Sequence, residues 1–551
     1  MTLVCVPILV NDVPGALSDA ERAKGLGAEL VEYRIDAFFT GGGDPHEEKA
    51  VFALLARSPL PCVLTCRSAA EGGHYEGPEE ARALLLETVS RADHPGQMPP
   101  RYIDVEHEAY AGSARTRALV DSAVGHGRSR HELGASLILS MHDFGGRPAD
   151  LSRRMVRMCA EPAARIVKVA YRARTVRDNL ELLDLIGQCS HPAIALGMGP
   201  FGTMSRVLAP KFGAFLTFAA LREGAATAPG QPTLHELLGT YRFRSVFPTT
   251  KVYGVVGWPV GHSLSPLVHN AGFSGVGHDG VYVPLPVQAS ADAEASFASL
   301  KATLLELIDH PRLDFAGCSV TVPHKEGLLR LARQQGWRID PVAAAVGAAN
   351  TLVVPRDKAT PRLPLVSNTD VPAAAEWIRA GVGDLGGASI GVIGAGGVAR
   401  AVAYGAASAG AHVVVFNRTR SRAERLAMDL LPALPQGHGP VVVGDWDRVC
   451  EARCGAWVNC TPVGMQGGPD PGSSPIMPER LRRCAEKPIV MDAVYRPVHT
   501  PLLTAAREAG WSTVDGVGFF VGQAELQFAL WTGVPASAGL FERLAREELA
   551  R

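Results

Sequence analysis

The stretch Ser389-Ile390-Gly391-Val392-Ile393-Gly394-Ala395-Gly396-Gly397-Val398-Ala399-Arg400 joins an apolar, β-branched run to a glycine-rich turn. An Ala-rich segment follows, and His412–Phe416 is a second apolar run, so the order is strand, helix, strand. Gly394 permits a tight turn, Gly396 lets the backbone approach a pyrophosphate, and Ala399 takes the third small position of a dinucleotide fingerprint. Free N–H groups at such a helix start bind phosphate. The stretch therefore predicts a dinucleotide-binding unit, although the glycines alone would also fit the turn of an ordinary βαβ unit.

The end of the second apolar run distinguishes between two cofactors. Sites for NAD place Asp or Glu there, where the carboxylate binds the ribose hydroxyl. This chain has Asn417-Arg418-Thr419-Arg420 instead. An arginine guanidinium suits the 2′-phosphate of NADP. The sequence therefore predicts NADP as the cofactor.

Length and composition exclude several classes of protein. At 551 residues, with 47% hydrophobic and 20% charged residues, the chain is too long for one core and has a globular composition. The formal net charge is -1 and no long run of one sign occurs. Neither nucleic acid nor an anionic membrane is therefore expected as a partner. We expect two or three globular domains that bind small molecules.

The cysteines and the hydropathy pattern indicate where the protein works. None of the ten cysteines forms a CxxC pair. Cys62 with Cys66, and Cys450 with Cys454, have neither zinc-knuckle spacing nor a set of histidine partners, so no metal site is expected. Met1–Val6 lacks the basic region of a signal peptide, and no segment has the length and apolar character of a membrane span. We expect a soluble, cytoplasmic protein with reduced thiols.

The first 220 residues contain eight short apolar runs, separated by amphipathic stretches rich in Ala, Leu and Arg. Eight strand-then-helix repeats predict an α/β fold, a closed (β/α)8 barrel of parallel strands with helices outside. The runs are Leu3–Pro7, Leu30–Tyr33, Cys62–Thr65, Tyr102–Val105, Ser136–Ser140, Ile166–Ala170, Ala193–Leu196 and Phe215–Phe218.

Polar residues occupy the C-terminal ends of these runs, where such a barrel carries out chemistry. They are Glu32, Arg34, Arg67, Asp104, Glu106, His142, Asp143 and Lys168. Lys168 is the most informative, because apolar neighbours would solvate its charge poorly and favour the neutral, nucleophilic amine. A barrel lysine predicts a Schiff-base enzyme acting on a ketone or aldehyde, with His142 as general acid and base. Two alternatives stay open: Lys168 reaches water or pairs with Glu106, and His142 is a core or surface residue.

The first half resembles the type I 3-dehydroquinate dehydratases over nearly all of its length. The strings that carry the resemblance are Glu32-Tyr33-Arg34-Ile35-Asp36, Thr65-Cys66-Arg67, Glu71-Gly72-Gly73, Ser140-Met141-His142-Asp143-Phe144, Val167-Lys168-Val169-Ala170, Ser205-Arg206 and Ala228-Pro229-Gly230-Gln231. The resemblance implies that Lys168 forms an imine with the ketone of 3-dehydroquinate. It implies that His142, hydrogen-bonded to Glu71, transfers the proton and helps water to leave.

The same resemblance implies which residues bind the substrate of the barrel. The hydroxyls and the carboxylate are expected to contact Glu32, Arg34, Arg67, Arg206 and Gln231. A guanidinium suits the carboxylate because its planar fork binds both oxygens. Thr227 stands where the family has serine, so the loop that covers the substrate keeps a hydroxyl and gains a methyl group.

A second domain is predicted to begin near Lys251, after a loop rich in Gly, Ala, Thr and Pro and a short helical stretch at Leu234–Tyr241. The run Lys251–Gly257 is typical of a strand, and Ser263 and Ser265 come before a helix opened by proline. The two hydroxyls can bind a substrate carboxylate or cap the helix.

Further strings stand at expected strand ends on both sides of the dinucleotide unit. They are Val320-Thr321-Val322-Pro323-His324-Lys325, Gly347-Ala348-Ala349-Asn350-Thr351 and Asn368-Thr369-Asp370 before it, and Val458-Asn459-Cys460-Thr461 and Asp492-Ala493-Val494-Tyr495 after it. A lysine and an aspartate that converge can relay a proton during hydride transfer to a carbonyl. Gly516–Trp531 predicts a last amphipathic helix that folds back across the first subdomain.

Together these strings resemble shikimate dehydrogenase over the whole of residues 251–551. The resemblance implies that Lys325 and Asp370 are the catalytic pair. The implied substrate ligands are Ser263, Ser265 and Tyr495 for the carboxylate, and Thr321, Asn350, Asp370 and Gln523 for the hydroxyls. The residues implied to surround NADP are Gly394, Ala395, Gly396, Gly397, Val398, Asn417, Arg418, Thr419, Thr461 and Gly518. Residues 290–312 are more than the family needs at that place, and no function is assigned to them.

The sequence as a whole predicts a fusion of these two enzymes. Residues 1–241 are expected to form the dehydratase barrel. Residues 251–551 are expected to form the dehydrogenase, with a substrate-binding subdomain at 251–370, an NADP-binding subdomain at 371–518 and C-terminal helices at 519–551. The expected reactions convert 3-dehydroquinate to 3-dehydroshikimate and then, with NADPH, to shikimate.

Two alternatives to this function are weaker. One is a dehydrogenase that prefers quinate and NAD, which Arg418 disfavours. The other is a metabolite-sensing regulator that has kept both folds and lost the chemistry. Such a protein is expected to lose catalytic residues, whereas Lys168, His142, Lys325 and Asp370 all stand in intact motifs.

Overall fold

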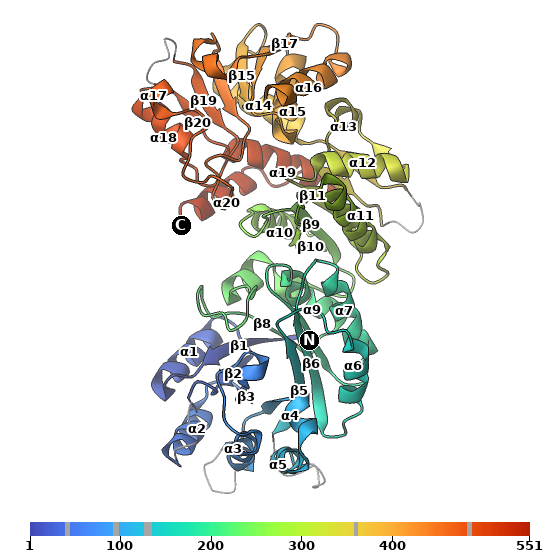
Figure 1. Cartoon of the computed structure of the whole chain (residues 1–551), viewed down its shortest axis with the longest axis vertical. Coiled ribbons are helices and arrows are strands. Elements are labelled where there is room, and N and C mark those ends of the chain that lie inside the picture. Colours follow the sequence, from blue (N-terminus) through green and yellow to red (C-terminus); the bar gives the residue numbers. More distant parts are fainter. Residues whose placement is uncertain (39–44, 92–97, 126–134, 357–361, 482–486) are drawn as a thin grey trace. The chain divides into compact units, whose positions relative to one another are not determined.

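Eight parallel strands in the first half of the chain make up the barrel that the sequence predicts, as the computed structural model shows (Figure 1). Their order is β7-β6-β5-β4-β3-β2-β1-β8. At the seam between β7 and β8 the amide of Phe215 donates to the carbonyl of Ala193 at 2.9 Å, so a backbone hydrogen bond closes the barrel there in place of a strand ladder. The strands are β1 (Leu3–Leu9), β2 (Leu30–Arg34), β3 (Cys62–Thr65), β4 (Tyr102–Glu106), β5 (Ser136–Asp143), β6 (Ala164–Arg172), β7 (Ala193–Met198) and β8 (Leu216–Phe218).

Helices surround these strands (Figure 1). Every residue of β2 and of β4 is buried, because helices cover the outer face of a barrel while side chains fill its interior. The helices are α1 (Val13–Gly25), α2 (Pro45–Arg57), η1 (Ala69–Glu71), α3 (Glu79–Arg91), α4 (His107–Gly112), α5 (Ala114–Ala123), α6 (Leu151–Cys159), α7 (Asp178–Gln188), α8 (Thr203–Val207), α9 (Ala209–Phe212), η2 (Glu236–Thr240) and η3 (Phe243–Ser245). The structure describes residues 1–38, 45–91, 98–125, 135–356, 362–481 and 487–551.

The chain divides after Thr250 into two units, Met1–Thr250 and Lys251–Arg551. The end of the first unit is anchored on the barrel. Lys211 Nζ donates to the carbonyls of Pro248, at 2.6 Å, and of Thr250, at 2.9 Å. Residues up to Thr250 therefore pack with the barrel.

The second unit begins with a mixed sheet of six strands in the order β10-β9-β11-β13-β14-β12, in which β13 runs antiparallel to both neighbours. Helix α11 contains most of the stretch at 290–312. The strands are β9 (Lys251–Gly257), β10 (Gly280–Pro286), β11 (Phe315–Val320), β12 (Arg338–Ile339), β13 (Thr351–Val353) and β14 (Leu365–Ser367). The helices are α10 (Ser265–Gly275), α11 (Ala293–Asp309), α12 (Lys325–Gln335) and α13 (Pro341–Val346).

The dinucleotide stretch forms the centre of a third sheet, which is parallel throughout and has the order β17-β16-β15-β18-β19-β20. The order reverses between β15 and β18, and doubly wound sheets bind dinucleotides at such a reversal. The predicted strand–helix–strand unit of a dinucleotide-binding fold is therefore confirmed. The strands are β15 (Ser389–Ile393), β16 (His412–Phe416), β17 (Val441–Val443), β18 (Ala456–Asn459), β19 (Ile489–Asp492) and β20 (Thr513–Val514). The helices are α14 (Asp370–Val382), α15 (Gly397–Ser408), α16 (Arg420–Leu430), η4 (Leu431–Ala433), η5 (Trp446–Glu451), α17 (Pro478–Leu481) and α18 (Pro501–Glu508).

The chain then returns to the mixed sheet through α19 (Val517–Thr532) and α20 (Leu540–Leu549). Phe528 and Trp531 of α19 share a core with Tyr253 and Tyr282 of that sheet. The predicted helix through Trp531 is α19, and it returns to the first subdomain as expected, with α20 as the second C-terminal helix. Its predicted amphipathic character was wrong, since buried side chains occur around most of α19. None of the helices within the described ranges combines the length and apolar character that a membrane crossing requires.

Candidate active sites

Nine residues that the sequence predicts for the barrel site line one pocket. Because all nine lie in β2, β5 or β6 or in segments that follow β3, β7 or β8, closure of the barrel brings them together. Phe144, Leu196, Met198 and Phe218 add apolar walls. The nine are Glu32, Arg34, Arg67, Glu71, His142, Lys168, Arg206, Thr227 and Gln231.

Lys168, on β6, lies among carboxylates. Its Nζ donates to Asp104 Oδ2 at 2.8 Å and lies 3.6 Å from Glu32 Oε1, with its side chain only 6% exposed. The expectation of apolar surroundings was wrong for the ammonium group, because strands β2 and β4 direct carboxylates into the barrel. The alternative partner, Glu106, was also wrong. The ring of Phe218, 4.6 Å away, provides the apolar contact.

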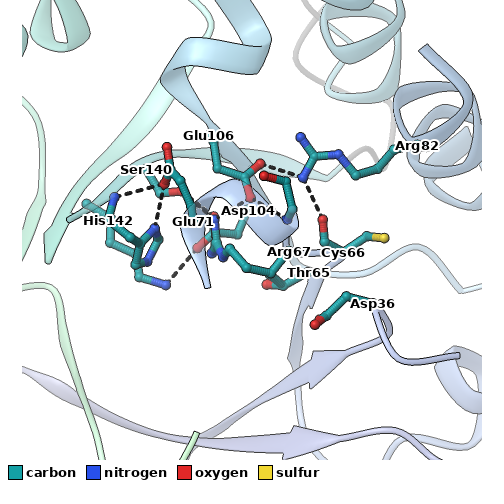
Figure 2. A network of polar contacts seen from close by, with 12 residues as sticks. Asp36, Thr65, Cys66, Arg67, Glu71, Arg82, Asp104, Glu106, Ser140 and His142 are labelled. Carbon is teal, nitrogen blue, oxygen red and sulfur yellow. Dashed lines mark hydrogen bonds and ion pairs between the residues drawn. The ribbon is translucent and has the colours of Figure 1, made fainter. Parts of the chain in front are cut away.

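Asp104 joins Lys168 to a second buried cation, Arg67. Figure 2 shows Asp104 beside Arg67. The guanidinium of Arg67 bonds Asp104 Oδ1 at 2.8 Å, Ser140 Oγ at 3.0 Å and Glu106 Oε1 at 2.9 Å. Burial by itself would raise the pKa of Asp104, but the two cations hold it well below its usual range. Arg67 is therefore committed to protein groups, which differs from the direct role at the substrate that the resemblance implies.

Glu71 and His142 form a hydrogen-bonded pair (Figure 2). Glu71 Oε2 accepts from the backbone N–H of His142 at 2.8 Å and lies 3.0 Å from Nδ1 of its ring. Burial raises the pKa of Glu71 to about 8, although Arg67 opposes the rise. Burial, Arg67 and Lys168 lower the pKa of His142 well below its usual value. At neutral pH the pair therefore holds a proton on Glu71 and leaves the imidazole neutral, a suitable state for a general base.

The arginines of the pocket differ in their partners. Arg34 binds Asp36 with both arms of its fork, at 2.8 and 3.0 Å. Arg206, on α8, is 1% exposed, and among the described residues its Nε and Nη1 have no hydrogen-bond partner. Burial lowers the pKa of Arg206 to about 10. Arg206 is thus a buried cation whose donors are available to an anion. Thr227 and Gln231 lie together, since the Thr227 N–H donates to Gln231 Oε1 at 3.1 Å.

Sequence reasoning missed part of this pocket's polar network. Asp104 and Glu106 carried a signal, as acidic residues at the end of a predicted strand. Arg82, on α3, bonds Glu106 Oε2 at 2.6 Å and the carbonyl of Cys66 at 2.7 Å, and nothing in its sequence surroundings pointed to the site. Ser140, which donates to Asp104 Oδ1 at 2.6 Å, stood in a motif without an assigned role.

Lys325 and Asp370 meet in the second unit. Lys325 Nζ donates to Asp370 Oδ2 at 2.5 Å, and Asp370 Oδ1 accepts from Asn350 Nδ2 at 2.9 Å. Lys325 opens α12 just after β11, and Asp370 opens α14 just after β14, so the two strand ends place them. Both are largely withdrawn from solvent, with side chains 11% and 3% exposed. Thr321, also predicted, is half-buried at the end of β11.

A buried chain of hydrogen bonds supports this pair. Tyr282 donates to Ser319 Oγ at 2.6 Å, Ser319 donates to Gln527 Oε1 at 2.7 Å, and Gln527 Nε2 donates to the carbonyl of Asn350 at 3.0 Å. The predicted glutamine, Gln523, instead donates to the carbonyl of Phe520 on its own helix at 2.9 Å. Gln527 carried no signal in the sequence.

Ser263, Ser265 and Tyr495 lie near the start of α10. Ser263 Oγ accepts from the N–H of Ser265 at 3.2 Å, a local cap of the kind that the alternative interpretation expected. Burial raises the pKa of Tyr495, and a hydrogen bond with the Ser263 side chain opposes the rise. The serine loop and the tyrosine loop, from different sheets, therefore meet here.

The glycine-rich turn has room for a dinucleotide. Gly394 has a φ of +116°, and a Cβ built on Gly396 would meet no atom within 4 Å, so the backbone is open to a phosphate. A Cβ on Gly397, the first residue of α15, would come within 3.1 Å of Lys325 Cδ. Ala395 and Val398 pack partly buried against the core of the sheet. The turn therefore lies directly beside Lys325.

The side chains that follow β16, where the cofactor's ribose is predicted to lie, differ in whether other residues hold them. Arg418 is exposed, and no bond to another described residue holds its side chain. Arg420 is paired with Glu424 at 2.8 Å, and Asn417 Nδ2 donates to the carbonyl of Thr419 at 2.8 Å. Among the other predicted cofactor residues, Thr461 bonds Asn459 through both its N–H and its hydroxyl, and Gly518 lies beside the ring of Trp377.

Sequence models of known families match most of the chain. The model for type I 3-dehydroquinase matches residues 4–248. Models for the shikimate dehydrogenase substrate binding domain and the shikimate 5′-dehydrogenase C-terminal domain match residues 255–352 and 516–546. A model for coenzyme F420-dependent NADP oxidoreductase matches residues 389–439, around the glycine-rich turn.

Individual relatives agree with these matches. The chain is 35% identical to a chloroplastic bifunctional 3-dehydroquinate dehydratase/shikimate dehydrogenase of Arabidopsis thaliana, over 98% of this chain and 83% of the relative. It is 36% identical to a shikimate dehydrogenase (NADP(+)) of Methanocella arvoryzae, over 54% of this chain and 99% of the relative. A crystal structure of shikimate 5-dehydrogenase from Thermus thermophilus with NADP(H) and shikimate is 31% identical, covers 54% of this chain and 99% of that chain, and superposes with a TM-score of 0.44. The chain belongs to the family of bifunctional 3-dehydroquinate dehydratase/shikimate dehydrogenases.

Proposed function

We propose that the chain catalyses two consecutive reactions, the dehydration of 3-dehydroquinate to 3-dehydroshikimate in the barrel and the NADPH-dependent reduction of 3-dehydroshikimate to shikimate in the second unit. One observation carries the proposal: a single pocket holds a buried amine, Lys168, a carboxyl–imidazole pair, Glu71 with His142, and a guanidinium with open donors, Arg206. An elimination through an imine, on a ketone that also bears a carboxylate, requires these three groups.

In the barrel, Arg206 binds the substrate carboxylate, because a buried cation with open donors gains most from an anion. The ammonium of Lys168, which Asp104 binds, first gives a proton to the neutral imidazole of His142, and the amine then attacks the ketone carbon. His142 returns that proton to the carbinolamine hydroxyl, which leaves as water and gives an iminium that acidifies the neighbouring C–H. His142 then takes the C–H proton and returns a proton to the departing hydroxyl, while Glu71 holds the ring in place. Water then hydrolyses the imine, which frees Lys168 and 3-dehydroshikimate.

In the second unit, Lys325 donates a proton to the carbonyl oxygen, and Asp370 orients the ammonium. NADPH supplies the hydride when it is bound. The open backbone at Gly396 fits its pyrophosphate, and Arg418 fits its 2′-phosphate. Ser263, Ser265 and Tyr495 bind the substrate carboxylate through their hydroxyls.

Two measurements test the proposal. Borohydride added together with 3-dehydroquinate should reduce the imine and fix the substrate on Lys168, where peptide mass spectrometry locates it. An adduct on another lysine, or none, rejects the dehydratase assignment. NADPH oxidation with 3-dehydroshikimate supplied directly tests the second site by itself, and absence of oxidation there rejects the dehydrogenase.

We also propose that residues 1–241, together with the segment up to Thr250 that packs on them, and residues 251–551 act as separate catalytic domains in the cytoplasm. All nine cysteines within the described part of the chain are free thiols, which suits a reducing compartment. A barrel fragment should end after Thr250, because Lys211 binds the backbone there. Each fragment should keep its own activity to within about ten-fold in kcat/KM, or roughly 1.4 kcal/mol. A larger loss in a folded fragment would show that the two sites depend on each other.

A further inference from the structure

Two loops of the NADP-binding sheet share one buried anchor, Asp492. It is the last residue of β19, it is fully buried, and it lies opposite Asn459 at the end of β18. Its Oδ1 accepts from Asn459 Nδ2 at 2.9 Å and from the N–H of Val494 at 3.0 Å. Its Oδ2 accepts from the hydroxyl of Thr500 at 2.7 Å. All its partners are neutral, and none of them belongs to the catalytic pair.

Two of the three partners of Asp492, Asn459 and Val494, adjoin residues that the proposed function uses. Asn459 Oδ1 in turn accepts from the N–H of Thr461 at 3.0 Å and from its hydroxyl at 2.7 Å. Thr461 packs on the dinucleotide turn, since a Cβ built on Gly394 would come within 3.1 Å of Thr461 Cγ2. On the other side, the N–H of Val494 directly precedes Tyr495. Oδ1 of Asp492 therefore bonds both loops. It holds the cofactor loop, which contains Thr461, through Asn459, and the substrate loop, which contains Tyr495, through the N–H of Val494.

The surroundings of Asp492 make this anchor rigid. Burial raises its pKa to about 6, while the hydrogen bonds from Thr500, Val494 and Asn459 oppose the rise, so it is ionised at neutral pH. A buried carboxylate that accepts three hydrogen bonds leaves few alternative arrangements of the groups that bond it. The two loops also touch directly, since the N–H of Gln466 donates to the carbonyl of Arg496 at 2.9 Å.

We infer that Asp492 is a positioning residue that couples the two binding events, so that the cofactor on the Thr461 loop raises the affinity for substrate at the Tyr495 loop. Because Asp492 bonds both loops, a ligand that favours one arrangement of the first loop also favours the matching arrangement of the second. Coupling of this kind is reciprocal, so shikimate raises the affinity for the cofactor by the same factor. The inference rests on the proposed function of the second unit.

The test measures the dissociation constant of NADPH with and without saturating shikimate, since these two reduced ligands do not react with each other. In the wild type, shikimate should tighten NADPH binding by about five-fold or more. In Asp492→Asn, one acceptor oxygen becomes a donor, and the factor should fall to near one. Asn459→Ala cuts the same connection and should have the same effect.

Asp445→Asn is the matched control, because Asp445 is also an aspartate of this subdomain, but its side chain accepts from the N–H of Asp447 to cap η5. It should keep the full factor. A factor of one in the wild type, or an unchanged factor in a folded Asp492→Asn or Asn459→Ala variant, would overturn the inference. Wild-type protein that binds neither ligand would instead reject the proposed function.

A separate observation concerns two cysteines on the outside of the barrel. Cys159 ends α6 and Cys189 follows α7, and their Sγ atoms lie 2.7 Å apart. Both are half-buried, and His191 is close enough to complete a group whose ligand atoms lie within 4.8 Å of one another. Burial, and then the neighbouring thiol, raise the pKa of Cys159 to about 12. Nothing in the proposed chemistry uses this pair.

The geometry points to a thiol modification site, in which Cys159 and Cys189 are oxidised to a disulfide by a small disulfide such as glutathione disulfide. The Cys189 thiolate attacks the reagent, forms a mixed disulfide and releases one glutathione thiol. Cys159 then loses its proton to water and attacks the Cys189 sulfur, which releases the second. The new bond encloses residues 160–188, including the strand that carries Lys168, and should raise the unfolding temperature of the barrel.

Treatment of the whole chain with glutathione disulfide, followed by mass spectrometry, tests this site. The expected product has lost two hydrogens and gives a peptide that links Cys159 to Cys189, while the buried Cys62 stays a thiol. Cys189→Ser should give no internal bond and no rise in unfolding temperature. Stable glutathione adducts on both cysteines, or a stoichiometric metal that a chelator must remove before oxidation occurs, would overturn the proposal.

Discussion

Replacing Arg206 by methionine should make the free protein more stable while it damages the dehydratase. Arg206 is 1% exposed, and its Nε and Nη1 have no hydrogen-bond partner among the described residues. No anion among those residues therefore offsets the cost of burying its charge. Arg67→Met is the matched control, since Arg67 is also buried, at 2%, but bonds Asp104 and Glu106. The two substitutions remove the same group from the same pocket and should shift stability in opposite directions.

The magnitudes follow from burial. The fall in the pKa of Arg206 to about 10 is equivalent to roughly 3 kcal/mol against the charged form in the folded state. Because the folded pKa lies below the unfolded one, this cost is present at every pH below about 10 and disappears only above it. Arg206→Met should therefore gain about 1–3 kcal/mol across neutral pH, after some loss of packing. Arg67→Met should lose about 3–5 kcal/mol, because it leaves buried carboxylates with less compensation.

The assay must report on the barrel itself, and all seven tryptophans lie after residue 251. Hydrogen exchange and mass spectrometry of peptides from β5 and β6, over a series of urea concentrations, give the stability of the barrel. Tryptophan fluorescence of the same samples follows the second unit and should not change. The kcat/KM for 3-dehydroquinate should fall by roughly ten- to a hundred-fold in Arg206→Met, the scale of a lost charge-assisted hydrogen bond.

A clear result would refute this reasoning. If Arg206→Met destabilised the barrel as much as Arg67→Met does, Arg206 would have a partner anion in the free protein. If it were stabilising but left kcat/KM unchanged, the guanidinium would not bind the substrate carboxylate.

Three further outcomes can be measured directly. Burial raises the pKa of Glu71 from 4.5 to about 8, so the free energy of unfolding of the wild type falls as pH rises from 4.5 to 8. Glu71→Gln has no such loss, so its free energy of unfolding relative to the wild type should rise by up to roughly 5 kcal/mol over that range in urea titrations. A difference between the two proteins that stays constant with pH would contradict the raised pKa. Arg418→Ala should lower the preference for NADP over NAD by about ten- to a hundred-fold, while Arg420→Ala, whose guanidinium is tied to Glu424, should change it little; the reverse order would assign the phosphate to Arg420. Lys325→Ala should lower kcat by roughly a hundred-fold or more with a small change in KM, and near-normal kcat with a raised KM would make Lys325 a binding residue.

The fold could be predicted because its strands are short, apolar and regularly spaced. The run Cys62–Thr65 is a strand with those bounds, and Tyr102–Val105 differs from β4 by one residue. The doubly wound sheet followed from the βαβ signal at Ser389–Phe416. The seam between β7 and β8 left no trace in the sequence, because it depends on the register of two strands.

The sequence predicted which residues lie in each site more readily than it predicted what each of them does there. The sequence placed Arg34, Arg67 and Arg206 together, but their roles depend on which carboxylates other strands bring near them. The surroundings of Lys168 were mispredicted for the same reason, since Asp104 stands 64 residues earlier in the chain and reaches it only through barrel closure. Gln527 was missed because a buried glutamine in an apolar helix looks like any other until its partners are known.

The contact between Gly397 and Lys325 limits how this dehydrogenase can evolve. A Cβ at Gly397 would alter the glycine-rich turn and would also come within 3.1 Å of Cδ of Lys325, the proposed proton donor, so the lysine side chain would have to shift. Selection for a new cofactor and selection for turnover therefore both act on position 397. Because residues in contact are energetically coupled, mutations at Gly397 and Lys325 are not expected to be additive. Lineages that exchange NADP for NAD should change residues 417–420 and keep the glycine.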